Sequence, residues 1–174
     1  DDIQSINATG FGPQWIACSY SRGDSIVSTG ANGRGIKFHG LLESNFENLV
    51  GLNSASTGIA ITLRTQYNNF KNLVAMQNAA GSGSNDIGLW FSGQSNIANY
   101  FFGVELTTNR NFDIQTNSTD TDNVIEGVHF DAFSKISNRG GPTNIIIGSP
   151  SGSDFYGFVT QDDGKDDSVD HGKN

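Results

Sequence analysis

The stretch Ser44-Asn45-Phe46-Glu47-Asn48-Leu49-Val50 occurs again 24 residues later, almost unchanged, as Asn68-Asn69-Phe70-Lys71-Asn72-Leu73-Val74. Only the first and fourth positions differ between the two copies. A period in the twenties is typical of stacked-repeat proteins, in which each repeat lies directly on its neighbour. The sequence therefore predicts that Phe46 stacks on Phe70 inside such a stack. It also predicts that Asn45 stacks on Asn69, with their side-chain amides hydrogen-bonded.

Weaker copies of the asparagine-apolar opening follow along the chain. The anchor asparagines stand at positions 45, 69, 96, 123 and 144, so the spacings are 24, 27, 27 and 21 residues. We interpret this as one irregular period in which each insertion is a surface loop.

A second set of segments alternates apolar and polar residues, which is typical of half-buried strands. These segments lie at 35–40, 58–63, 86–91, 103–107 and 127–131, with 111–115 as a further candidate. No helical period long enough for a crossover helix separates them, so we expect stacked parallel strands rather than a sandwich or barrel of antiparallel ones. The predicted inward residues are Ile36, Phe38, Ile59, Ile61, Ile87, Leu89, Phe91, Val104, Leu106, Val128 and Phe130. The 17-residue interval from Ile87 to Val104 is short for one coil; either these two residues lie on different faces or one assignment is wrong.

Composition and charge limit the classes of fold and function that the chain can have. The chain has 174 residues and 22 glycines, well above the average of about 7%, and Phe, Ile and Val dominate its apolar set, which favours strands and turns. A net charge of −8 disfavours nucleic-acid binding and attachment to anionic lipid. No apolar run approaches the roughly 20 residues of a membrane helix, so we expect no membrane insertion.

No sequence motif calls for a cofactor or a metal. The glycine-rich segment 30–35 leads into a strand rather than a helix, so it is not a phosphate loop. The acidic segment 162–170 has no closing glutamate for a calcium loop. The tripeptide Arg22-Gly23-Asp24 matches integrin-binding loops, but so short a match arises by chance and an ordinary turn explains it. We expect an entry segment or cap at 1–34, coils at 35–159 and an acidic, flexible tail at 160–174.

Coils in the low-to-mid twenties, asparagine-apolar openings, Gly-Ile or Gly-Val strand starts and Gly/Ser-rich turns resemble the right-handed parallel β-helices. This superfamily includes pectate lyases, polygalacturonases and bacteriophage tailspikes. The irregular period, the polar surface and the acidic charge are most similar to a phage tailspike or tail-fibre shaft. The resemblance implies an all-β, right-handed, single-stranded parallel β-helix, here a fragment of a longer one. It also implies a homotrimer, on the virion tail or extracellular, that binds host-surface polysaccharide.

Enzymatic activity stays open at this stage, with glycoside hydrolase or polysaccharide lyase as the classes to consider. If Val104 and Val128 are equivalent inward positions, Glu105 and His129 stack outward as neighbours, and Asp131 projects to the same side. Such a group offers the carboxylates that glycan hydrolysis requires. The alternative is that these are ordinary polar residues of an outward face.

Glycan binding without cleavage requires exposed aromatic side chains, because a flat apolar ring with a polar edge suits recognition surfaces. The sequence predicts Trp90 in this role, since it points outward between Leu89 and Phe91, with Tyr67 and Tyr100 as further candidates. The alternative for Trp90 is packing at a trimer interface or under a loop.

Overall fold

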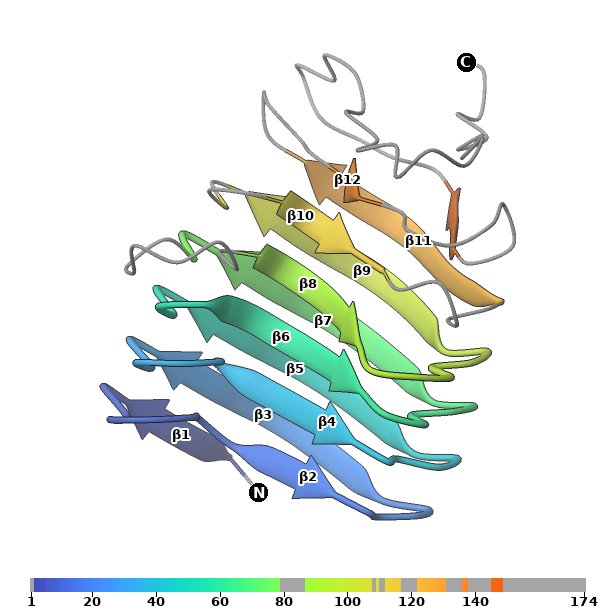
Figure 1. Ribbon diagram of the computed structural model, residues 1–174, viewed down its shortest axis with the longest axis horizontal. Helices are drawn as coiled ribbons and strands as arrows, with labels where there is room; N and C mark the ends of the chain where they lie inside the picture. Colours follow the sequence, from blue (N-terminus) through green and yellow to red (C-terminus); the bar gives the residue numbers. More distant parts are fainter. Residues whose placement is uncertain are drawn as a thin grey trace.

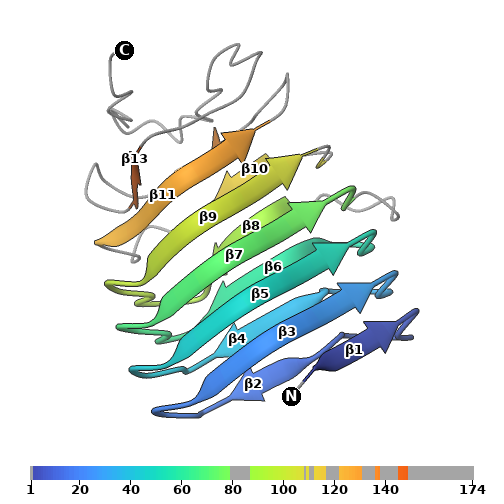
Figure 2. The same cartoon turned by 180° about the vertical axis from the view of Figure 1, so that it is seen from behind.

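The computed structural model describes residues 2–78, 87–107, 109, 112–116, 122–130, 136–137 and 145–148. In this part of the chain the protein is an all-β solenoid of two parallel sheets, and each turn adds one strand to each sheet (Figures 1 and 2). The odd-strand sheet contains β1 (Ile3–Ile6), β3 (Arg22–Thr29), β5 (Asn45–Leu52), β7 (Asn69–Met76), β9 (Tyr100–Thr107), β11 (Asn123–Phe130) and β13 (Ile145–Gly148). The even-strand sheet contains β2 (Gln14–Ile16), β4 (Ile36–His39), β6 (Thr57–Thr62), β8 (Ile87–Ser92), β10 (Phe112–Gln115) and β12 (Ile136–Ser137).

The repeat that begins at residue 44 behaves as its sequence predicts. Phe46 and Phe70 are register partners in β5 and β7, and their rings stack with centroids 6.0 Å apart and planes 18° from parallel. The Asn69 amide donates to Asn45 Oδ1 at 3.0 Å. Phe101 extends the aromatic column, with its ring 4.8 Å from that of Phe70. The prediction of a helix-free stack of parallel coils is therefore confirmed.

The short interval from Ile87 to Val104 has a simple explanation, because the two residues belong to different sheets. Ile87 lies in β8 of the even-strand sheet and Val104 in β9 of the odd-strand sheet. The even-strand sheet continues instead at Phe112, the register partner of Ile87. The prediction that Asn96 is equivalent to Asn69 is wrong: the register partner of Asn69 in the next turn is Tyr100.

The core occupies the space between the two sheets, and the predicted inward residues fill it. Ten of the eleven predicted side chains are buried, and the side chain of Phe130 lies outside the described ones. The odd-strand sheet completes the core with Ile26, Phe46, Leu49, Phe70, Leu73, Ala75, Phe101 and Ile125. Because this packing repeats at every coil, each turn is stabilised mainly by its two neighbours.

The chain turns at four corners where residues of successive coils adopt a positive φ. These corners comprise Asn7, Gly30, Asn53 and Gln77; Ala17, Gly40, Leu63 with Arg64, and Gly93 with Ser95; Tyr20, Glu43, Tyr67, Ala98 and Asp122; and Ser25, Asn48, Asn72, Gly103 and Gly127. Glycine and asparagine adopt this conformation at little cost, whereas bulky residues do so against a steric penalty. The last corner lies inside the odd strands, so those strands bend before they continue along the core.

Residues 2–34 carry the same architecture as the coils after residue 35. β1 pairs with β3, β3 with β5 and β2 with β4, all parallel and in register. Parallel strand pairing therefore continues across residue 34, and the division into an entry segment or cap and coils stays a prediction. The predicted tail at 160–174 lies outside the described residues. The described part of the chain contains no helix long and apolar enough to span a membrane.

Candidate functional site

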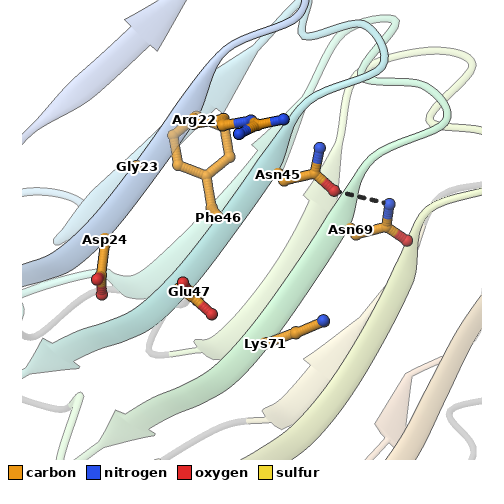
Figure 3. A pocket seen from close by; sticks show the side chains of 8 residues that line it. All are labelled: Arg22, Gly23, Asp24, Asn45, Phe46, Glu47, Asn69 and Lys71. Carbon is orange, nitrogen blue, oxygen red and sulfur yellow. Dashed lines mark hydrogen bonds between the residues drawn. The ribbon is translucent and has the colours of Figure 1, made fainter.

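A hollow of about 530 Å³ lies on the outer surface of the odd-strand sheet, over the first halves of β3, β5 and β7. Figure 3 shows the side chains that surround it. Its lining consists of Arg22, Gly23, Asp24, Asn45, Phe46, Glu47, Asn69 and Lys71. Polar side chains capable of donating and of accepting hydrogen bonds therefore converge on one surface depression.

Strand alternation and the coil register place these side chains together. Arg22, Asn45 and Asn69 are successive register partners and form one row across the coils. Asp24, Glu47 and Lys71 form a second row two residues further along the same strands. Between the rows, Phe46 points into the core below. A Cβ at Gly23 would come within 2.6 Å of the Phe46 ring, so the absence of a side chain there lets the ring pack.

Asp24 is the most firmly held charged group of the hollow. Its Oδ1 accepts hydrogen bonds from the Asn48 amide at 2.7 Å and from the Ser25 hydroxyl at 3.0 Å. These two hydrogen bonds lower the pKa of the Asp24 carboxyl below its ordinary value. Asp24 is therefore an ionised acceptor at neutral pH, and it is unsuited to the role of a general acid.

The Arg-Gly-Asp tripeptide is part of this hollow. The expectation that it forms a turn is wrong, because Arg22–Thr29 is strand β3 and the tripeptide is its extended start. Arg22 and Asp24 project from the outer face of the sheet, and Gly23 lies against Phe46. The tripeptide thus forms part of the lining of the hollow on the sheet surface and does not project as a loop.

A row of corner residues borders the hollow. Tyr20, Glu43 and Tyr67 occupy the same corner in three successive coils, each two residues before a member of the first row of the lining. Both tyrosines have positive φ, 54° and 57°, and their side chains are 73% and 56% exposed. We call Tyr20, Glu43 and Tyr67 the tyrosine ridge. It presents two aromatic rings to solvent beside the polar hollow.

The three predicted glycan-binding residues have different surroundings. Tyr67 belongs to the tyrosine ridge. Trp90 points outward as predicted, but it lies in the even-strand sheet and the Arg34 guanidinium covers its ring, 4.5 Å from the centroid. The Tyr100 hydroxyl donates to Glu126, and this hydrogen bond is the main cause of a raised pKa of Tyr100. Tyr67 lies two residues before Asn69, and Tyr100, the register partner of Asn69, continues the first row of the lining into the next coil.

The predicted catalytic residues are partly brought together. Glu105 and His129 are register partners on β9 and β11, in the row that continues from Val74, as the equivalence of Val104 and Val128 predicts. Asp131 lies outside the described residues. Neither Glu105 nor His129 lines the hollow, and the described residues hold no group of three His, Cys, Asp or Glu side chains that could bind a metal ion.

The sequence predictions missed the hollow and two of the three ridge residues, Tyr20 and Glu43. Tyr20, Glu43 and Tyr67 follow one another at 23 and 24 residues, which is the coil period, so the repeat spacing contains the signal. No protein-family model matches the chain, and comparisons with curated proteins and with solved structures give no significant match.

Proposed function

We propose that this chain is a carbohydrate-recognition module, of the kind carried by phage tailspikes and tail fibres, that binds a host-surface polysaccharide across the hollow of the odd-strand sheet. The observation that carries the proposal is the tyrosine ridge, in which two exposed tyrosines are held at positive φ beside a polar depression.

The solenoid corner itself sets the positive φ of the ridge, since Ala98 and Asp122 share it in later coils, but a tyrosine at this corner has a steric cost. A non-glycine residue in the left-handed region is disfavoured by about 1–2 kcal/mol, and the cost persists only where the surroundings impose it. Asparagine occupies comparable corners at residues 7, 53 and 72. A tyrosine at such a corner stabilises the fold little, since most of its ring is in solvent, but it displays a flat apolar face with a hydroxyl at its edge.

The hollow supplies the hydrogen bonds that a sugar requires. Arg22, Lys71 and the amides of Asn45 and Asn69 can donate, while Asp24 and Glu47 can accept. Tyr20 and Tyr67 stand two coils apart, about 10 Å at the usual strand spacing, with Glu43 between them. A chain of sugars lying across the coils would therefore meet an aromatic ring at each end of a polar strip.

Binding to bacterial capsular and cell-wall polysaccharides, measured by titration calorimetry, tests the proposal. A Tyr20→Ala, Tyr67→Ala double variant should bind at least about tenfold more weakly, because each buried aromatic contact is worth on the order of 1 kcal/mol. Ile6→Ala is the matched control, because Ile6 is a large apolar residue of similar exposure, 69%, that does not line the hollow. Equal affinity of the double variant and the parent protein would contradict a role of the ridge.

Hydrolysis of the bound polysaccharide is the alternative function, and one observation favours it. Asp24 and Glu47 are register partners in the hollow, so two carboxylate side chains rise from adjacent coils. Release of reducing ends, or absorbance of unsaturated uronates for a lyase, measures cleavage. Activity lost in Glu47→Gln would place the chemistry in the hollow, whereas activity lost only in Glu105→Gln would place it at the Glu105–His129 pair.

The proposed class also implies a homotrimer. The second halves of β3, β5 and β7 present the partly exposed row Val27, Val50 and Val74 beside Leu52 and Met76, which gives the outer face an apolar area next to the hollow. Sedimentation equilibrium at micromolar concentration checks this part of the proposal, and a monomer would contradict it for this chain.

A further inference from the structure

The outer face of the even-strand sheet holds a second group of polar and aromatic side chains, away from the hollow. The Arg34 guanidinium lies 4.5 Å from the centre of the Trp90 ring and 5.9 Å from that of Phe11. Lys37 Nζ lies 5.8 Å from the same Phe11 ring. We call Arg34, Lys37, Trp90 and Phe11 the cationic cluster. The even strands face the viewer in Figure 1 and the odd strands in Figure 2.

The coil register explains how the cationic cluster is assembled. Lys37, Ala60 and Trp90 are successive register partners and form one outward row. Ala60 is fully buried although it points outward, so neighbouring side chains close over it. Arg34 precedes β4 and comes to rest on the Trp90 ring. His39, two residues after Lys37, is fixed by a hydrogen bond of 3.0 Å between its Nδ1 and Thr62 Oγ1.

The positive charges of the cationic cluster are not compensated within the described part of the chain. No described carboxylate forms an ion pair or hydrogen bond with Arg34 or Lys37, although the protein carries a net charge of −8. Burial lowers the pKa of Arg34, and burial together with Arg34 lowers the pKa of Lys37. Two partly desolvated cations that lie close together are unfavourable. A bound anion would offset the free-energy cost of their desolvation and their mutual repulsion.

We propose that the cationic cluster binds the carboxylate of a sugar acid, such as a uronic acid residue, with Arg34 as the recognition group. The planar guanidinium offers parallel N–H donors that match the two oxygens of a carboxylate. The Arg34 guanidinium is already held 4.5 Å from the centre of the Trp90 ring before a ligand binds, so less side-chain entropy is lost on binding. Trp90 is therefore a positioning residue, and Lys37 adds a second positive charge.

A sugar acid fits the cationic cluster better than an acidic peptide does. Phe11 adjoins both cations and its side chain is 51% exposed, so an apolar ring face lies next to the charged groups. A sugar acid presents a carboxylate and an apolar ring face within one residue. The inference rests on the proposed function in taking the ligand to be a carbohydrate, but it concerns a different sheet and different residues.

The indole N–H signal of Trp90 in a proton–nitrogen NMR spectrum reports directly on the cationic cluster. The chain has two tryptophans, and Trp90→Phe assigns the signal. Titration with glucuronate should shift the Trp90 signal to saturation, while glucose at the same concentration should leave it in place. Acetate should shift it more weakly, because it lacks the ring that contacts Phe11. An equal response to sulfate and glucuronate, or no response to glucuronate at millimolar concentration, would overturn the assignment.

Variants separate this site from the hollow. Arg34→Gln should weaken glucuronate binding by roughly tenfold or more. Arg34→Lys keeps the positive charge but removes the paired N–H donors of the guanidinium, so it should weaken binding by several fold. Lys37→Gln provides a second variant, and thermal melting of each variant checks that it folds. Undiminished binding by Arg34→Gln would overturn the inference. The Tyr20→Ala, Tyr67→Ala protein should keep the full response of Trp90, so a failure of the hollow and a failure of the cationic cluster give different results.

Discussion

The side-chain amide of Asn68 donates to Asn99 Oδ1 at 2.9 Å, from one coil to the next, inside the solenoid. Asn99 in turn donates to Asn123 Oδ1 at 2.9 Å, and Asn68 Oδ1 accepts the backbone N–H of Ser44 at 2.9 Å. These residues form a buried amide ladder directly beside the exposed pair Asn45 and Asn69. Two neighbouring asparagines on one chain segment thus make ladders in opposite environments.

The buried ladder predicts a large loss of stability in Asn68→Ala. The substitution leaves the Ser44 N–H without its acceptor and removes donors from the carbonyls of Leu41 and Gln66. Each unsatisfied buried group costs about 1–3 kcal/mol, so we expect the free energy of unfolding to fall by about 2–4 kcal/mol. Urea denaturation followed by circular dichroism measures the change.

Asn69→Ala is the matched control for that experiment. Asn69 is exposed and its amide bond to Asn45 competes with water, so the free energy of unfolding should change by no more than about 0.5 kcal/mol. A similar loss in the two variants would show that burial does not distinguish the two ladders.

The fold could be predicted because one near-perfect repeat survives in the sequence, and the buried ladder was missed for a related reason. The repeat pairs Ser44 with Asn68, which looks like a mismatch, although both side chains serve the same internal column. Asn99 follows Asn68 by 31 residues because a longer connection intervenes, and insertion lengths cannot be read from one sequence. The same insertion led to the wrong equivalence of Asn96 with Asn69.

The candidate site was harder to predict because three separate coils build it. Alternation within a strand gave the outward direction of Trp90, but the cover provided by Arg34 comes from a residue 56 positions away. Tyr20 escaped notice since propensity rules expect glycine or asparagine at positive φ. The sequence therefore did not predict that the ridge residues form a corner, although their spacing matches the coil period.

Gly58→Ala should destabilise the protein strongly. A Cβ at this position would lie 2.5 Å from Asn78 Nδ2 and 2.9 Å from Ala75 Cβ, and Asn78 belongs to a second internal ladder through Asn109. Such overpacking costs about 1–3 kcal/mol, and the melting temperature should fall accordingly. Gly10→Ala is the control, because a Cβ there meets no atom within 4 Å and its φ is not in the left-handed region. An equally stable Gly58→Ala protein would contradict the close packing of β6 against Ala75 and Asn78.

Tyr67→Asn should separate stability from binding. Asparagine tolerates positive φ better than tyrosine does, and the lost ring is 56% exposed, so the free energy of unfolding should rise by about 0.5–1 kcal/mol. Polysaccharide binding should weaken at the same time, because one ring of the tyrosine ridge is gone. Tyr67→Phe should preserve the free energy of unfolding and the polysaccharide binding of the parent protein, apart from what the lost hydroxyl contributes to binding. A Tyr67→Asn protein that is less stable than its parent would contradict the strain on which the ridge argument depends.

The surroundings of His39 predict how its titration responds to the cationic cluster. Burial, followed by the charges of Lys37 and Arg34, lowers the pKa of His39 below its ordinary value of 6.5. The folded protein therefore binds this proton less readily than the unfolded chain, and His39 reduces stability as the pH falls below about 6.5. Lys37→Gln removes one of the two charges, so the pKa of His39 should rise toward its ordinary value. The loss of stability from about pH 7 to pH 5 should become shallower as well.

Proton NMR titration of the imidazole Cε1–H signal measures the pKa of His39, with Lys71→Gln on the opposite sheet as the control. A pKa of His39 that is unchanged in Lys37→Gln, or that moves equally in Lys71→Gln, would show that Lys37 does not act on this imidazole.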